Sequence, residues 1–163
     1  MFNTFDLIVS YPVPVNERKE FDYLLAAYAA MPKGRWLNDL AWRGFEFKYC
    51  QKMADSSVMG AFVVTAPGTI YIMPQSATII NEAIIAPHIR PTWPEIIIST
   101  VIHELRHAWQ YRRWKWLYVL CCLPVIREFT IEVDAKRVQK DADAFFETFS
   151  ARRAAREFEE RMK

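Results

Sequence analysis

The sequence is poor in cysteine and glycine, and these shortages limit the classes of protein to which the chain can belong. Its three cysteines, Cys50, Cys121 and Cys122, are odd in number and two of them are adjacent, so no disulfide framework is indicated. We therefore expect buried free thiols in a reducing compartment. The chain contains no Cys-x-x-Cys pair, which excludes a structural zinc ribbon. Only four glycines are present, and no segment has the composition of a disordered chain.

The sequence also has little excess charge and no targeting signal. A net charge of +2 gives no argument for a nucleic-acid partner, and we expect none. The first residues lack a basic region, and the apolar run at residues 7–9 is far shorter than a signal-peptide core. We expect a cytoplasmic protein. With 163 residues, 52% of them hydrophobic, the chain is predicted to form one domain over residues 1–163 with a substantial core.

The longest apolar stretch, residues 114–126, is too short to cross a membrane. It contains Lys115 and Pro124 and has 13 residues, whereas a span needs about 20. Two interpretations stay open. The stretch belongs to the core or forms a docking surface for a protein, or its Trp, Tyr and basic residues contact a membrane interface. We favour the first, because short apolar runs usually belong to cores.

The first half of the chain predicts a mixture of helices and strands. A helix is expected from Asn16, as its cap, to Ala30, with Phe21, Leu24, Leu25 and Tyr28 along one side. A second, short helix is expected over residues 36–42. Strands are expected at residues 5–10 and 45–49, and residues 61–65 and 69–73 form a β-hairpin signal around Ala66-Pro67-Gly68. Residues 78–85 are ambiguous between strand and helix.

Two of the only three histidines fall in the pattern His103-Glu104-x-x-His107. On a helix His103 and His107 lie one turn apart, so both imidazoles can reach one metal ion. Glu104 is rotated by about 100° from His103 and can reach a metal-bound water without binding the metal. Zinc-dependent hydrolysis needs two neutral imidazoles, an open coordination position and a carboxylate that takes a proton from water.

The residues around this pattern support a helix. Thr92-Trp93-Pro94-Glu95 is a capping box with proline in the first turn. No Gly or Pro follows up to about Arg113. Ile98, Ile102, Leu105 and Trp109 form an apolar stripe, and His103, His107 and Tyr111 form a different one. We therefore expect one face of the helix in the core and another facing a cleft.

A catalytic zinc site needs a third protein ligand, and the charged helical pattern from Glu128 to Lys163 supplies carboxylates. Its remaining Arg and Glu residues are expected to form a solvated face. Glu132 stands 25 residues after His107, followed by the small Ala135 three positions later. This arrangement resembles the gluzincin branch of the zincin-like metallopeptidases, and in particular its small, minimal members.

The resemblance covers roughly residues 60–140. It implies Zn²⁺ bound by His103, His107 and Glu132, with Ala135 letting the helices approach each other, and hydrolysis of peptide bonds in a peptide or protein substrate. The implied fold is α+β, with a small mixed or antiparallel sheet packed on the helix of the two histidines and on a C-terminal glutamate helix. A third histidine at the position of Arg113, expected in metzincins, is absent.

The sequence departs from the gluzincin pattern behind the ligands. Many members carry Asp at the position of Lys136, where it supports a ligand histidine. Asp134 is the substitute at hand, although its position on the helix does not favour it. Glu128 lies one turn before Glu132 and is a rival third ligand. We favour Glu132.

Two functional hypotheses follow. In the first, Glu104 is the general base of a zinc peptidase, and His88, Tyr111 or Tyr71 stabilises the oxyanion. Thr69–Met73 is then expected to be an edge strand that pairs with extended substrate. In the second, the zinc site serves stability or partner binding without catalysis, and residues 114–126 form the contact surface. A weaker, third idea is action at a membrane surface through residues 112–116.

Overall fold

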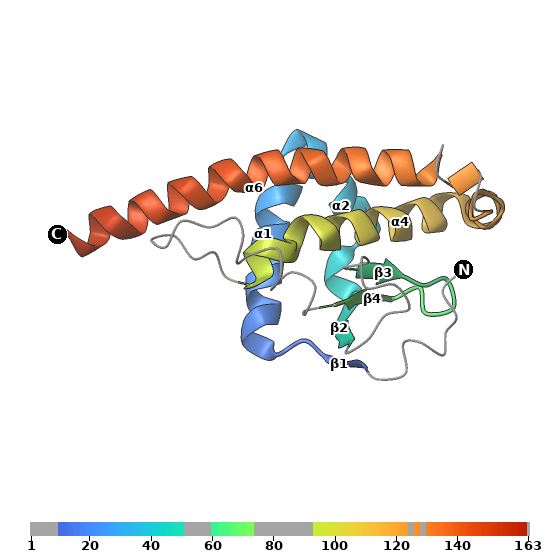
Figure 1. Ribbon diagram of the computed structural model, residues 1–163, viewed down its shortest axis with the longest axis horizontal. Coiled ribbons are helices and arrows are strands. Elements are labelled where there is room, and N and C mark those ends of the chain that lie inside the picture. Colours follow the sequence, from blue (N-terminus) through green and yellow to red (C-terminus); the bar gives the residue numbers. More distant parts are fainter. Residues whose placement is uncertain (1–9, 51–59, 74–92, 124–125, 128–129, 163) are drawn as a thin grey trace.

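The computed structural model describes residues 10–50, 60–73, 93–123, 126–127 and 130–162, and within them the fold is α+β (Figure 1). The helices are α1 (Val15–Ala29), α2 (Trp36–Leu40), α4 (Trp93–Cys121) and α6 (Ile131–Arg161), with short 3-10 helices η2 (Pro32–Gly34) and η3 (Trp42–Gly44). The strands are β1 (Ser10–Pro12), β2 (Glu46–Cys50), β3 (Gly60–Phe62) and β4 (Thr69–Ile72). Helix α4 lies between the sheet and α6 (Figure 1).

The described strands form one mixed sheet in the order β1-β2-β4-β3. Strands β2 and β4 are parallel, whereas β1 pairs with β2 and β3 pairs with β4 in antiparallel fashion. The predicted hairpin is confirmed as β3 and β4, and the strand predicted at residues 45–49 is confirmed as β2. The prediction that Thr69–Met73 forms an edge was wrong, because β2 covers the other side of β4. Within the described sheet, β3 is the edge on that side.

Three predicted boundaries were also wrong. Residues 5–9 of the first predicted strand lie outside the described residues. Strand β1 continues past the predicted end at Ser10 to Pro12, which an edge strand tolerates because a proline there loses no ladder hydrogen bond. Helix α1 is not capped by Asn16: Pro14 holds the N-cap position in an extended conformation and Asn16 lies inside the first turn. Helix α2 ends at Leu40 because Ala41 adopts a left-handed conformation with φ of 55°.

The predicted apolar stripes form the core. Phe21, Leu24, Leu25 and Tyr28 of α1 are buried, as are Ile98, Ile102 and Leu105 of α4. They pack with Phe47, Ile70 and Ile72 from the helix-facing side of the sheet. Helix α6 closes the core from the other side through Phe145 and Phe146, whose rings contact the ring of Tyr28.

Helix α4 begins at Trp93, as predicted, while the capping residue Thr92 lies outside the described residues. The helix was expected to end near Arg113 and instead continues to Cys121 with non-helical angles at Trp114 (φ −135°, ψ 45°). Most described residues beyond Trp114 are exposed, so the expectation that this stretch belongs to the core was wrong, whereas a docking surface and a membrane contact stay open. Its exposed large side chains, with those that follow it, are Trp114, Trp116, Leu117, Val119, Leu120, Leu123 and Ile126. Across the described residues, no helix combines the length and apolarity that a membrane crossing requires.

Gly60 marks a close approach of β3 to α4. A Cβ atom at this position would lie 2.9 Å from Thr100 Cγ2 and 3.0 Å from Glu104 Cγ. Such distances are shorter than van der Waals contact, so only glycine lets the strand lie directly against the helix that carries the histidines.

We therefore expect Gly60→Ala to lower the free energy of unfolding by about 1 to 3 kcal/mol, because the strand or the helix must move. Gly68→Ala is the matched control, since its Cβ would meet no atom within 4 Å and its φ is not positive. The control should change stability by less than about 0.5 kcal/mol. Urea denaturation measures both, and equal stability of the two variants would contradict the close approach.

Candidate metal centre

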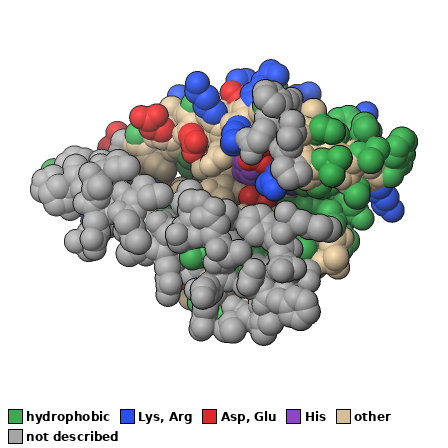
Figure 2. Space-filling model, turned by 45° about the vertical axis from the view of Figure 1, so that its right-hand side comes forward, with side chains coloured by type: hydrophobic (Ala, Val, Ile, Leu, Met, Phe, Trp, Pro, Cys, Tyr) green, Lys and Arg blue, Asp and Glu red, His purple; other side chains and the backbone are tan. Residues whose placement is uncertain are grey.

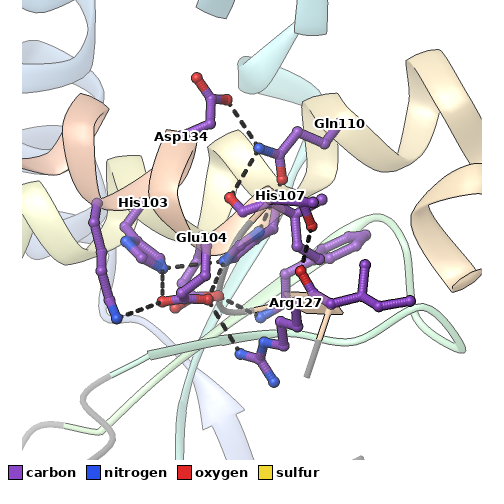
Figure 3. A network of polar contacts seen from close by, with 12 residues as sticks. His103, Glu104, His107, Gln110, Arg127 and Asp134 are labelled. Carbon is purple, nitrogen blue, oxygen red and sulfur yellow. Dashed lines mark hydrogen bonds and ion pairs between the residues drawn. The ribbon is translucent and has the colours of Figure 1, made fainter. Parts of the chain in front are cut away.

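His103 and His107 face each other from successive turns of α4, as the sequence predicted (Figure 3). Their Nε2 atoms are 3.1 Å apart, and both side chains are buried. The buried position follows from the apolar stripe on the neighbouring face of α4, which anchors the helix in the core.

Glu132 joins the two histidines from the first turn of α6. Its Oε1 atom is 3.3 Å from His103 Nε2, and its Oε2 atom is 3.3 Å from His107 Nε2. The structure thus brings together the three residues that the sequence nominated as ligands. Glu128, the rival, lies outside the described residues. Ala135 is completely buried, as expected of a small residue that lets two helices approach.

The spacing of the three side chains fits a zinc ion. Zinc binds imidazole nitrogen and carboxylate oxygen at about 2.0 to 2.2 Å in tetrahedral sites. Two ligand atoms of such a tetrahedron are separated by about 1.63 times that length, or about 3.3 to 3.6 Å. The measured separations of 3.1, 3.3 and 3.3 Å are at or just below this range. Each imidazole nitrogen is thus near one tetrahedral edge length from the other nitrogen and from one of the two Glu132 oxygens, so the three side chains could hold a single ion.

Gln110 fixes the protonation of His107. The amide Nε2 of Gln110 donates to the carbonyl oxygen of Ile131 at 3.1 Å and to Asp134 Oδ2 at 2.9 Å, and both partners can only accept. The Oε1 atom of Gln110 must then be the atom that lies 3.0 Å from His107 Nδ1. That nitrogen consequently carries the proton, and the lone pair on Nε2 points to Glu132 and His103. This is the tautomer that a metal requires.

Asp134 anchors this arrangement between the two helices. Its carboxylate accepts hydrogen bonds from Arg106 at 2.6 and 3.3 Å as well as from Gln110. The guanidinium of Arg106 lies over the rings of Trp36 and Trp109. Burial raises the pKa of Asp134. The hydrogen bonds from Arg106 and Gln110 and the charge of Arg106 lower it by more than burial raises it, so the pKa lies below its usual value. Asp134 thus supports His107 through Gln110, although its helical position was expected to disfavour that role.

His103 has a different environment. Its Nδ1 atom is buried and has no hydrogen-bond partner of ordinary geometry among the described residues, although Gln139 of α6 is near enough to affect its pKa. Burial lowers the pKa of His103, but hydrogen bonding with Glu132 and the charges of Glu104 and Glu132 outweigh burial and raise it.

Positive charge surrounds Glu132. Hydrogen bonding with His103 is the first cause that holds the pKa of its carboxyl well below the usual range, and burial acts in the opposite direction. Arg127 Nη2 is 3.4 Å from Oε2 and Lys136 Nζ is 3.9 Å from Oε1. Lys136 therefore faces the carboxylate of the third candidate ligand, at the position where gluzincins carry Asp.

Glu104 is held beside the histidines by the sheet. Its Oε2 atom accepts a hydrogen bond of 2.8 Å from the backbone N–H of Phe62 in β3. The side chain is buried next to Gly60, where the strand approaches α4 most closely. Strand β3 thus fixes the carboxylate that the sequence assigned as general base.

An aromatic wall borders the histidines. The Tyr118 ring, from beyond Trp114, lies 6.2 Å from the His107 ring and 5.7 Å from the ring of Tyr111, and Phe62 contacts both tyrosines. Burial raises the pKa of the Tyr118 hydroxyl far above its usual range, so it stays protonated at neutral pH. Tyr71 packs instead with Cys50, Ala61, Val63 and Met73, in a cluster separate from the main core. His88 lies outside the described residues.

No protein-family model, curated protein or solved structure matches this chain. The interpretation of the site therefore depends on its own geometry.

Sequence reasoning missed Gln110, Tyr118 and Arg127. Gln110 lies three residues after His107, and that spacing on a helix was a usable signal. Tyr118 and Arg127 gave no signal, because the bend at Trp114 and the path between α4 and α6 bring them to the site.

The charges of the site predict a stability optimum for the metal-free protein. Glu132 and Asp134 have lowered pKa values, so their contribution is complete above about pH 4.5 and is lost as the pH falls further. His103 has a raised pKa, so its contribution is complete below about pH 6.5 and is lost as the pH rises through the folded-state value. Urea denaturation in chelator should show greatest stability between about pH 4.5 and 6.5.

Glu132→Gln serves as the comparison for this optimum. This substitution removes the carboxyl group of Glu132, whose pKa is lowered, and with it part of the cause that raises the pKa of His103. Both sides of the pH profile should become flatter, and a profile identical to that of the wild type would contradict the assignment.

Proposed function

We propose that this protein is a zinc-dependent metallopeptidase of the gluzincin type with a zincin-like fold. The observation that carries the proposal is the triangle of His103, His107 and Glu132, whose edges are close to those of a tetrahedral zinc site. A bound zinc ion supplies a Lewis acid that polarises a substrate carbonyl and lowers the pKa of water. The pattern His-Glu-x-x-His, the helix that carries it and the glutamate on a second helix support the same assignment.

Glu104 acts as the general base. A carboxylate beside the open position can take a proton from the attacking water and deliver it to the leaving amine. The hydrogen bond from Phe62 N–H holds one oxygen of Glu104 in place. Because the carboxylate is already held in position, less conformational entropy is lost when the transition state forms.

Tyr118 is the best oxyanion donor among the described residues. Its hydroxyl remains protonated, its ring borders His107, and a buried donor stabilises a developing negative charge better than an exposed one. Tyr111 lies behind it against Phe62. Tyr71 packs in a cluster that includes none of the candidate site residues.

Strand β3 is the edge that pairs with an extended peptide. It lies next to α4, and its only partner in the described sheet is β4. Pairing of main chains along this edge would place a peptide carbonyl beside Glu104 and the histidines. We accordingly propose a peptide or protein substrate and no nucleic acid. The three cysteines are unpaired, which supports the proposed cytoplasmic location. The expectation that all three thiols are buried was wrong, because only Cys50 is buried and Cys122 is exposed.

A second function remains as an alternative, a zinc-binding module that does not catalyse. The observation that favours it is the positive charge at Glu132, from Arg127 and from Lys136 at the position of the usual Asp. Two cations near the third ligand partly neutralise it, and this would lower its affinity for a metal. Such a module would use the site for stability or partner binding.

The metal is tested first by zinc content. Wild type should bind about one zinc per chain, because His103, His107 and Glu132 are grouped closely enough to hold one ion. Glu132→Ala should weaken zinc binding at least about 100-fold, whereas Glu128→Ala should leave it unchanged. Elemental analysis and competition with a chelator measure both variants, and circular dichroism checks their folding. Zinc lost only in Glu128→Ala would move the ligand to Glu128, and absence of zinc from reconstituted wild type would refute the metal centre.

Catalysis is tested with Glu104→Gln, which keeps an oxygen for Phe62 N–H and removes the base. Cleavage of a broad peptide library should fall by about 10² to 10⁴, with zinc content and stability unchanged. Asp143→Asn, an exposed carboxylate on α6, is the control and should retain full activity. If wild type with zinc cleaves nothing in the library, the module without catalysis becomes the better explanation.

A further inference from the structure

The outer face of α4 beyond Trp114 is apolar and exposed. Trp116, Leu120 and Leu123 lie at spacings of four and three residues, and their exposed fractions are 75%, 49% and 55%. Residues at these spacings share one side of a helix. Hydrophobic side chains gather at the end of the molecule where this part of α4 lies (Figure 2). We name Trp116, Val119, Leu120 and Leu123 the outer apolar face.

The opposite side of the same turns faces the candidate site. Tyr118 is the buried residue of this segment, with 6% exposure, and its ring contacts His107. Trp116 and Leu120 are each displaced from Tyr118 by about 200° around the helix axis. The two sides of this segment therefore have different surroundings. One side borders the candidate site through Tyr118, and the other presents large apolar side chains to the solvent.

The stretch of sequence that contains the outer apolar face, residues 105–127, carries only positive charge. Between Glu104 and Glu128 the sequence contains no Asp or Glu, and its Lys and Arg residues are Arg106, Arg112, Arg113, Lys115 and Arg127. Arg106 pairs with Asp134, whereas Arg112, Arg113 and Lys115 are exposed. Their charge complements an anionic surface.

These features distinguish between possible occupants of the face. A second copy of this chain would bring Arg113 and Lys115 of both copies close together, and like charges at an interface are costly. A bilayer with anionic lipids interacts favourably with each residue type on this surface. Tryptophan and basic residues lie at the level of the headgroups, and aliphatic side chains lie below them. The helix cannot span the bilayer, so it would lie along the surface.

We propose that the outer apolar face docks on an anionic membrane surface, with Trp116, Leu120 and Leu123 inserted at the interface and Arg113 and Lys115 contacting lipid headgroups. Two kinds of attraction, apolar insertion and positive charge, are what stable peripheral binding requires. Docking in this way would set the site, through Tyr118, next to the bilayer. The proposal concerns docking and does not depend on peptidase activity.

Vesicle flotation with the full chain tests the proposal. One set of vesicles contains phosphatidylcholine alone, and the other also contains phosphatidylglycerol. The protein should float with the anionic vesicles at about 0.05 M salt and much less at about 0.5 M, because salt screens the basic residues. It should bind the neutral vesicles more weakly at both salt concentrations.

Trp116→Ser/Leu120→Ser should reduce binding to the anionic vesicles at least about tenfold. Val15→Ser/Met31→Ser, which removes two exposed apolar side chains from the neighbourhood of α1, should bind as the wild type does. Circular dichroism should show all proteins folded, since every substituted side chain is exposed. Absence of binding to anionic vesicles at low salt, or equal binding by both double variants, would overturn the proposal. So would a wild-type dimer in sedimentation that Trp116→Ser/Leu120→Ser dissociates, because a second copy would then cover the face.

Discussion

The buried approach of three acceptor atoms to one another is the constraint on which the rest of the structure depends. Nε2 of His103, Nε2 of His107 and the carboxylate of Glu132 lie within 3.3 Å of each other in sequence-distant helices. Their lone pairs repel unless a cation lies among them. A proton on His103 would meet this need in the metal-free protein, and the zinc ion proposed above would meet it by binding all three side chains.

Holding these atoms together requires α6 to keep its position along α4. Near the site the two helices are joined by Arg106, Asp134 and Gln110, whose hydrogen bonds connect one helix to the other and to His107. Farther along α6, Arg153 pairs with Glu20 of α1 and Glu95 of α4. The long charged helix was expected to present a solvated face, and Arg153 shows that part of this charge instead fixes the helix to the domain.

Local patterns allowed a good share of the molecule to be predicted. The spacing of His103, Glu104 and His107 predicted which side of a helix they share. The two apolar runs at residues 61–65 and 69–73, joined by Ala66-Pro67-Gly68, were enough to predict the hairpin. The choice of Glu132 used a family resemblance, and the structure brings this residue to the histidines. What could not be predicted depends on contacts between distant segments: the position of β4 inside the sheet, the support of His107 by Asp134, and the arrival of Tyr118 at the site. The sequence left open whether residues 114–126 belong to the core or to a surface, because an apolar sequence does not tell which surface is available to cover it. Most of the described residues in this stretch are exposed.

The non-helical backbone at Trp114 divides α4 into two parts. The first part carries His103 and His107, and the second carries Tyr118 on one side and Trp116 on the other. Because Tyr118 and Trp116 belong to the same turn, a rotation of the second part about Trp114 moves both side chains together. Any free-energy difference that a ligand at one side creates between two orientations is felt equally at the other side, since linkage between two sites is reciprocal. A ligand bound beside Tyr118 and a partner bound to the outer apolar face would then influence each other through the orientation of this second part of α4.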